Sequence, residues 1–413
     1  MVNFEKSVLS NGLTLITHQD HTTPLVCVNT LYNVGARDEN PEKTGFAHLF
    51  EHLMFGGSKN IPNYDNIADN AGAENNAFTN NDITDFHITL PSQFLETALW
   101  LESDRMNELA FSEKSLTVQK NVVTEEFRQR YLNQPYGDLW LLTRPLSYQV
   151  HPYQWCTIGK DISHIQNAGI QDVRDFFYRF YRPDNAILSI AGNIDHDKTV
   201  RMVEKWFGDI PRGTGNLRNL PAEPEHTEAR TKTVYRNVPN SMIVKTYKMC
   251  NRKCPDYYTF DLISDILSNG KSSRLYNELV KKERLFSKID AYITGDIDEG
   301  LFVFSGYLND GVDIETAERG ILRQIEILQN ESIGETELQK VKNNVETTLL
   351  YSQYKIMDRA MNLAYFENIG DANCMNLETE KYSHVTSADI RRIAQGTFIN
   401  RHSSTLYYLK NEK

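Results

Sequence analysis

The sequence has no apolar run of the roughly 18 residues that a membrane-spanning helix requires. It also lacks an excess of basic residues, because 44 Lys and Arg stand against 55 Asp and Glu, a formal net charge of −11. Without a basic patch interleaved with aromatic residues, nucleic acid is not an expected partner. The N-terminus lacks the basic-then-apolar pattern of a secretory leader, so we expect a cytoplasmic protein, or a periplasmic one if a leader was removed.

Cysteine is also scarce, with five residues spread widely along the chain. Cys250 and Cys254 form the segment CNRKC, but a metal site would need a second Cys or His pair at comparable spacing, and none lies nearby in the sequence. We therefore expect five free thiols, which fits a reducing compartment.

The length and composition favour a soluble globular protein with more than one core. The 413 residues are 40% hydrophobic and 24% charged, and a chain of this length is expected to form two domains. A segment rich in Gly, Pro and charge predicts a linker at 213–232. The predicted domains are therefore 1–212 and 233–413.

The order of predicted strands and helices in the first domain returns in the second, which suggests an internal duplication. The two halves align at one helical segment, where five positions of the first half lie opposite five of the second: Phe46, His48, Glu51, His52 and Leu53 against Phe260, Leu262, Asp265, Ile266 and Leu267. The second half keeps the apolar helix but lacks both histidines.

The segment HLFEHLMFGG, residues 48–57, places three titratable side chains in an apolar run. In a helix, His48 and His52 lie on one face at positions i and i+4, so both imidazoles can reach one metal ion. Glu51 can then approach a water held by that ion, as in an HxxEH zinc site. The alternative is a pair of ordinary surface or core histidines. The interposed glutamate and the loss of the pair in the second half favour the metal site.

A catalytic zinc ion needs a third protein ligand and an open position. The candidates lie in a helix that Ser112 is predicted to begin, at NVVTEEF. Glu125 and Glu126 are adjacent, so only one of them can face the site. Spacing alone does not exclude that both are solvated helix charges.

HLFEHLMFGG and NVVTEE resemble the signature of the pitrilysin/insulinase family of zinc peptidases, the inverzincins. Further segments in the same order are SNGLTL (10–15), VGARDE (34–39), GAENNAFT (72–79), HPYQW (151–155) and FYRPDNAILSIAGNID (180–195). The resemblance implies that His48, His52 and Glu126 bind one zinc ion per chain and that Glu51 is the general base. Gln119 stands where the family has a second glutamate near the site.

The same resemblance implies an α+β fold of two homologous α/β-roll domains, each a mixed β-sheet with helices packed on one face. In the family, two such pairs of domains face each other like a clam shell, and they enclose a chamber that admits peptides or unfolded chains. This chain corresponds to one half of the shell and resembles the short members that form dimers, such as mitochondrial processing peptidase subunits. Asn76, Ala77, Phe78 and Thr79 match the strand that pairs with substrate, and Phe55 is a candidate for a side-chain pocket. Alternatively, NNAF is only a strand start and Phe55 a core residue.

Family peptidases also use an Arg and a Tyr from the second half to hold substrate. Here the aligned positions are Val280 and Ser287, so we expect a heterodimer whose zinc-free partner supplies the pair. A homodimer using Arg284 and Tyr292 is the alternative. The main alternative to an enzyme is a non-catalytic scaffold protein of the same fold. The intact HxxEH motif argues against this alternative.

Overall fold

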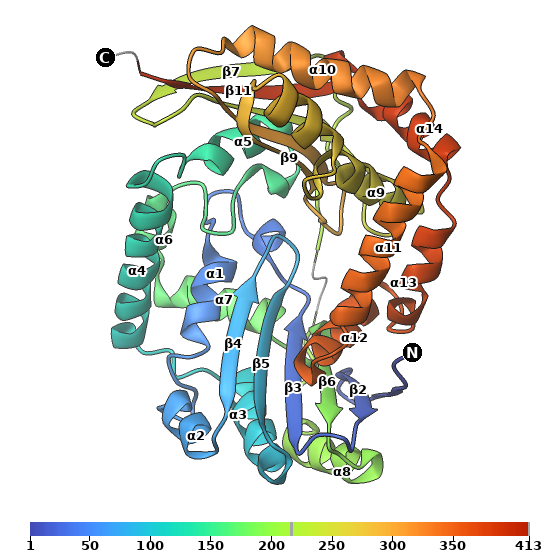
Figure 1. Cartoon of the computed structure of the whole chain (residues 1–413). Coiled ribbons are helices and arrows are strands. Elements are labelled where there is room, and N and C mark those ends of the chain that lie inside the picture. Colours follow the sequence, from blue (N-terminus) through green and yellow to red (C-terminus); the bar gives the residue numbers. More distant parts are fainter. Residues whose placement is uncertain (215–217, 412–413) are drawn as a thin grey trace. The chain divides into compact units, whose positions relative to one another are not determined.

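The computed structural model describes residues 1–214 and 218–411, which form two compact units with one β-sheet each (Figure 1). The first unit contains residues 1–130, 155–221 and 350–376, and the second contains the remaining segments. Two sheets with helices around them confirm the predicted α+β class. Among the described residues, no helix is both long and apolar enough to cross a membrane.

The first sheet has the strand order β1-β2-β6-β3-β5-β4. The central strands β3 and β6 are buried along almost their whole length, whereas the edge strand β4 has no fully buried residue. Their bounds are β1 (Glu5–Val8), β2 (Thr14–Gln19), β3 (Leu25–Tyr32), β4 (Glu74–Thr79), β5 (Thr84–Pro91) and β6 (Ala186–Gly192). The helices of this unit are α1 (Phe46–Leu53), α2 (Tyr64–Asn70), α3 (Leu95–Asn107), α4 (Glu113–Phe127), α6 (Ile162–Gln166), α7 (Ile170–Phe180), α8 (His196–Phe207) and α12 (Ile356–Ile369).

The second sheet repeats five strands of the first, in the order β7-β11-β8-β10-β9. The pair β2–β6 and its counterpart β7–β11 are parallel, and all corresponding remaining pairs are antiparallel. The predicted duplication is therefore confirmed by topology. The strands are β7 (Arg230–Arg236), β8 (Met242–Lys248), β9 (Phe286–Ile293), β10 (Leu301–Leu308) and β11 (Ser403–Lys410), and the helices are α5 (Leu139–Ser147), α9 (Tyr257–Ser268), α10 (Ile314–Asn330), α11 (Glu335–Tyr351), α13 (Cys374–Ser383) and α14 (Ser387–Thr397).

The two halves of the chain exchange one helix, which the sequence did not indicate. Helix α12, from the second half, packs on β3 and β6 of the first sheet, where Ala360 meets Cys27 and Ala191 (Figure 1). Helix α5, from the first half, packs on β7, β8 and β11 of the second sheet. Each sheet thus carries helices on both faces, with the exchanged helix on the face opposite the others.

This exchange makes the compact units differ from the predicted domains 1–212 and 233–413. Residues 131–154 belong to the second unit and 350–376 to the first, because each segment completes the other half's core. Of the predicted linker 213–232, residues 215–217 lie outside the described part of the chain. Its described residues form no helix or strand before β7 begins at Arg230. None of the five cysteines, all of which lie in the described ranges, forms a disulfide.

Candidate metal centre

Helix α1 carries the HxxEH segment and lies against the first sheet and helices α4 and α7. Its apolar residues Phe46, Leu49, Phe50 and Leu53 are buried, which turns the other face of the helix toward α4. The chain leaves the helix through a tight turn at Gly56 and Gly57, and Gly57 has a φ of 101° that suits glycine. The helix itself ends at Leu53, with Met54 as its C-cap, so the two glycines follow the helix end rather than cap it.

Helix α4 brings the third candidate ligand to this face. Its N-cap is Ser112, as predicted, whose side chain accepts a hydrogen bond from the backbone N–H of Ser115. Glu126 points toward α1, and its side chain is 17% exposed. The neighbouring Glu125 is 54% exposed and pairs with Arg128. The structure therefore decides between the two adjacent glutamates.

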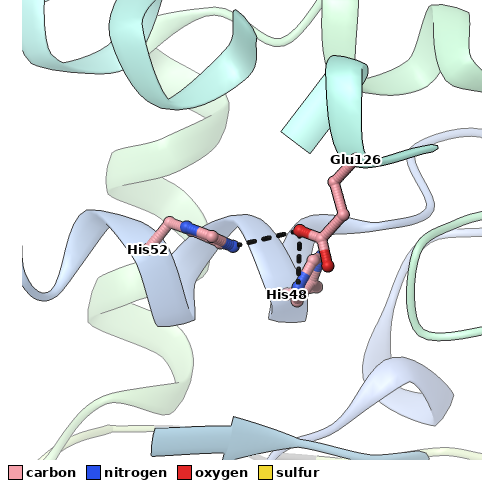
Figure 2. A group of neighbouring side chains, drawn as sticks. All are labelled: His48, His52 and Glu126. Carbon is pink, nitrogen blue, oxygen red and sulfur yellow. Dashed lines mark ion pairs between the residues drawn. The ribbon is translucent and has the colours of Figure 1, made fainter. Parts of the chain in front are cut away.

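His48, His52 and Glu126 converge on one point (Figure 2). Oε2 of Glu126 lies 3.6 Å from Nε2 of His48 and 3.5 Å from Nε2 of His52. Ligands at about 2.0–2.1 Å around a tetrahedral zinc ion would be about 3.4 Å apart. The two distances from Glu126 match this spacing, and the ligand atoms of all three residues lie within 4.8 Å of one another. This is the one group of three or more His, Cys, Asp or Glu residues within the described ranges that has metal-site spacing.

The charge states of these groups also suit a metal ion. Burial lowers the pKa of His48 to about 4, which keeps this imidazole neutral at pH 7. The pKa of Glu126 is lowered, first by its hydrogen bond with His52 and also by the positive charge of the nearby Arg130, so its carboxylate is ionised. Neutral imidazole and ionised carboxylate are the forms that bind metals.

Glu51 lies at the same site, close enough to His52 and Glu126 for their charges to affect its pKa. Burial raises this pKa, and a hydrogen bond with the Thr79 hydroxyl opposes the rise. A carboxylate with a raised pKa is better matched to accepting a proton near neutral pH.

The predicted substrate strand 76–79 lies in β4, at the edge of the first sheet. In the described part of the chain, β4 pairs with β5 alone. At the hairpin turn, the N–H of Asn80 donates to the carbonyl of Ile83. Hydrogen-bonded and non-hydrogen-bonded residue pairs alternate along an antiparallel ladder. The pair of Ala77 and Phe86 is therefore non-hydrogen-bonded, and the N–H of Ala77 points away from β5. That N–H donates to Oδ1 of the exposed Asn76 side chain. The edge is thus available for another strand.

Phe55 and Gln119 are adjacent to the site without joining the three converging atoms. Phe55 is half-buried and packs edge-on against Tyr64, with the Arg105 guanidinium 5.4 Å from its ring centre. Gln119 is half-buried on α4, beside Gly56.

The aligned Arg and Tyr positions lie in the second unit. Val280 is in a π-helical segment, Tyr276–Lys282, and Ser287 is in β9. Arg284 is exposed in a left-handed turn conformation with φ of 55°, and Tyr292 packs into a mostly buried cluster beside α5.

The sequence analysis missed two residues at the candidate metal centre: Arg130, which pairs with Glu126 at 2.8 Å, and Glu39, at the start of α1. Only the landmark VGARDE pointed to Glu39.

Comparison with known proteins identifies the family. The insulinase family model (peptidase family M16) matches residues 14–136, and the model named peptidase M16 inactive domain matches 167–345. The zinc protease PqqE of Helicobacter pylori is 30% identical over 98% of this chain and 92% of its own length. The chain belongs to the insulinase family of peptidases. The family resemblance seen in the sequence is confirmed.

Other members of the insulinase family match over most of the chain. The beta subunit of the mitochondrial-processing peptidase of Saccharomyces cerevisiae is 22% identical over 84% of this chain and 78% of its own length. The crystal structure of a protease from Helicobacter pylori superimposes with a TM-score of 0.92 at 29% identity, covering 99% of this chain and all of that one. The "inactive domain" model falls largely on the half without the two histidines.

Proposed function

We propose that this chain is a zinc-dependent endopeptidase that hydrolyses peptides or unfolded polypeptides inside a closed chamber. The observation that carries the proposal is the convergence of Nε2 of His48, Nε2 of His52 and Oε2 of Glu126, with the carboxylate of Glu51 beside them. Names of relatives such as zinc protease PqqE support it. His48, His52 and Glu126 would hold one zinc ion, which when bound supplies a Lewis acid that activates water and polarises the scissile carbonyl.

The residues of this chain then have distinct tasks. The carboxylate of Glu51 accepts a proton from the attacking water and delivers it to the nitrogen of the leaving amine. The edge of β4 binds the substrate as an added antiparallel strand, through the outward N–H of Ala77 and its neighbours. Such binding uses the peptide backbone, so it depends little on the substrate sequence.

The change Glu51→Gln tests the assignment of the base. The amide keeps the shape of the side chain but has no basicity, so zinc content should stay at one ion per chain while peptide hydrolysis falls at least about a hundredfold. Metal analysis together with cleavage of a quenched fluorescent peptide measures both. Glu125→Gln, on the exposed face of α4, is the matched control and should leave hydrolysis unchanged. Undiminished hydrolysis by Glu51→Gln would remove Glu51 from this role.

For the assembly, we propose a heterodimer with a related zinc-free chain that supplies an Arg/Tyr pair. Val280 and Ser287 cannot supply these side chains, and a relative named as a beta subunit supports a multi-subunit arrangement. Full activity of the purified chain alone would contradict this proposal and favour a homodimer that uses Arg284 and Tyr292. The second candidate function is a non-catalytic scaffold, and a chain that neither binds zinc nor gains activity with any partner would favour it.

A further inference from the structure

The start of α1 lacks the usual helix cap. Its N-cap residue is Gly45, which has no side chain to accept a backbone N–H and adopts a φ of 91°. The first-turn N–H groups of a helix have no partner within the helix, and leaving them buried and unbonded is costly. With only eight residues, α1 is too short to be stable without support from its surroundings.

Glu39 supplies the missing cap from the preceding loop. Its Oε2 accepts the N–H of Gly45 and its Oε1 accepts the N–H of Ala47, both at 2.8 Å. The side chain is almost completely buried, with 5% of the residue exposed. Burial raises the pKa of Glu39, and the hydrogen bonds from the N–H groups of Ala47 and Gly45 oppose this rise by stabilising the carboxylate. A carboxylate at a helix N-terminus also interacts favourably with the helix dipole. The second of these amides belongs to the residue immediately before His48.

The loop that carries Glu39 is itself fixed. The indole N–H of Trp155 donates to the carbonyl of Ala36 at 2.9 Å, and the buried Arg37 and Asp82 form an ion pair at 2.8 Å. Gly45 has no room for a side chain, because a Cβ there would lie 2.8 Å from the carbonyl oxygen of Ile158. Because these contacts hold the loop in place, the Glu39 carboxylate can fix the position of the first turn of α1.

We propose that Glu39 is a positioning residue for the metal centre: by bonding the first turn of α1, it sets where His48 and His52 stand relative to Glu126. This inference rests on the proposed function. Glu39 is not itself a ligand, since its oxygens are occupied by the amides of Gly45 and Ala47. Residues that orient metal ligands typically change metal affinity by about 10- to 100-fold when they are replaced.

The decisive variant is Glu39→Gln in the full chain. An amide keeps the size of the side chain but presents an NH₂ group to one of the two backbone N–H groups, so one of the two hydrogen bonds is lost. Glu39→Asp keeps the charge and is one methylene shorter, so it should give an intermediate result. Asp195→Asn is the control, because Asp195 caps the remote helix α8 by accepting the N–H of Lys198.

Three measurements separate positioning from a general loss of stability. Zinc affinity by competition with a chromophoric chelator should fall at least about tenfold in Glu39→Gln, and the visible spectrum of the cobalt-substituted chain should change. Hydrogen exchange of the metal-free chain should accelerate in the first turn of α1 and remain unchanged in α7. Asp195→Asn should have the zinc affinity and cobalt spectrum of the parent.

Unchanged zinc affinity and cobalt spectrum in Glu39→Gln would overturn this inference and leave the proposed function intact. A parent chain that binds no zinc would overturn both. If Glu39→Gln loses the circular dichroism spectrum of the folded parent, Glu39→Asp decides the matter: weaker zinc binding by a folded chain supports the inference, and parental affinity overturns it.

Discussion

At the scale of single residues, the candidate metal centre has a buried side at His48 and a more exposed side at Glu126. His48 is largely buried and neutral, whereas Glu126 is held from the solvent side by Arg130, whose side chain is 70% exposed. Oε1 of Glu126 bonds Arg130, which leaves Oε2 for the two histidines. Arg130 therefore fixes which carboxylate oxygen faces the site.

Replacing Arg130 with Ala should weaken zinc binding by about tenfold, because Glu126 loses the partner that orients it. The free energy of unfolding should change by less than about 0.5 kcal/mol, as expected for an exposed ion pair. Titration with zinc and chemical denaturation measure the two effects. Arg128→Ala, which removes the similar pair with the adjacent but solvent-exposed Glu125, is the control. Equal zinc affinities in the two variants would contradict this role.

At the scale of elements, strand β4 and helix α1 bring the proposed binding edge and the proposed catalytic groups together. Thr79 of β4 lies close enough to Glu51 of α1 for its hydroxyl to lower the pKa of that carboxylate, so the strand proposed to receive substrate lies beside the proposed general base. A peptide added to the free edge of β4 would then lie beside the metal centre. The geometry of this contact depends on the β4–β5 register, with Ala77 opposite Phe86.

The change Ala77→Pro tests binding at this edge. Proline removes the outward N–H without removing a hydrogen bond to β5, and edge strands tolerate proline. The loss of one backbone hydrogen bond to the peptide should lower kcat/KM about fivefold to tenfold. Ala77→Val keeps the N–H and should retain activity. Similar kinetics for the two variants would exclude a backbone contact at this position.

Helix α12 is anchored to the first unit by a charged contact as well as by its apolar face. Arg359 of α12 bonds Asp20 at 2.6 Å and His18 at 2.9 Å, next to the turn between β2 and β3. The pKa of Asp20 is lowered well below its usual value, first by the Thr22 hydroxyl and then by Arg359. The ionised form of Asp20 therefore contributes to stability.

This contribution predicts a pH dependence. Because the pKa of Asp20 is lower in the folded chain than in the unfolded one, the stabilisation is complete above about pH 5 and decreases as the pH falls below about 4. Asp20→Asn should lower the free energy of unfolding by about 1.5–3 kcal/mol at pH 7. Urea denaturation at pH 7 and pH 3 should show the difference between parent and variant shrinking in acid. A difference that stays constant with pH would contradict the assignment.

At the scale of the whole chain, the exchange of α5 and α12 means that neither half completes its own core. The face of the first sheet that contains Cys27 and Ala191 is covered by Ala360, Ile356 and Met357 of α12. A first half without α12 would expose this apolar face, and exposed apolar faces of sheets promote aggregation. The second sheet likewise depends on α5 from the first half.

A chain of residues 1–221 should therefore not unfold cooperatively and should self-associate. Adding residues 350–376 as a separate peptide should restore part of the cooperative transition, whereas the same peptide with Ala360→Asp should not, because a carboxylate would be buried against Cys27. Thermal unfolding by circular dichroism and size-exclusion chromatography measure these effects. A monomeric 1–221 chain that melts like the parent would show that α12 is dispensable.

The sequence by itself determined the local parts of this protein. The apolar periodicity predicted the principal strands and helices, and the i and i+4 spacing predicted that His48 and His52 share one face of a helix. These features depend on residues close in sequence, where backbone geometry relates spacing directly to position. The internal duplication was visible for the same reason, because each copy keeps its own order of elements.

Only the tertiary structure decided the long-range features. It placed Glu126 rather than Glu125 beside the histidines, which helix spacing alone left open and only the family resemblance implied. It also brought Glu39 to the start of α1 and exchanged α12 for α5 between the halves. Each of these features depends on which residues, far away in the sequence, pack against a given helix or strand. The same local pattern of apolar and polar residues is compatible with many such packing partners. The energy of packing, which is summed over the whole fold, chooses among them.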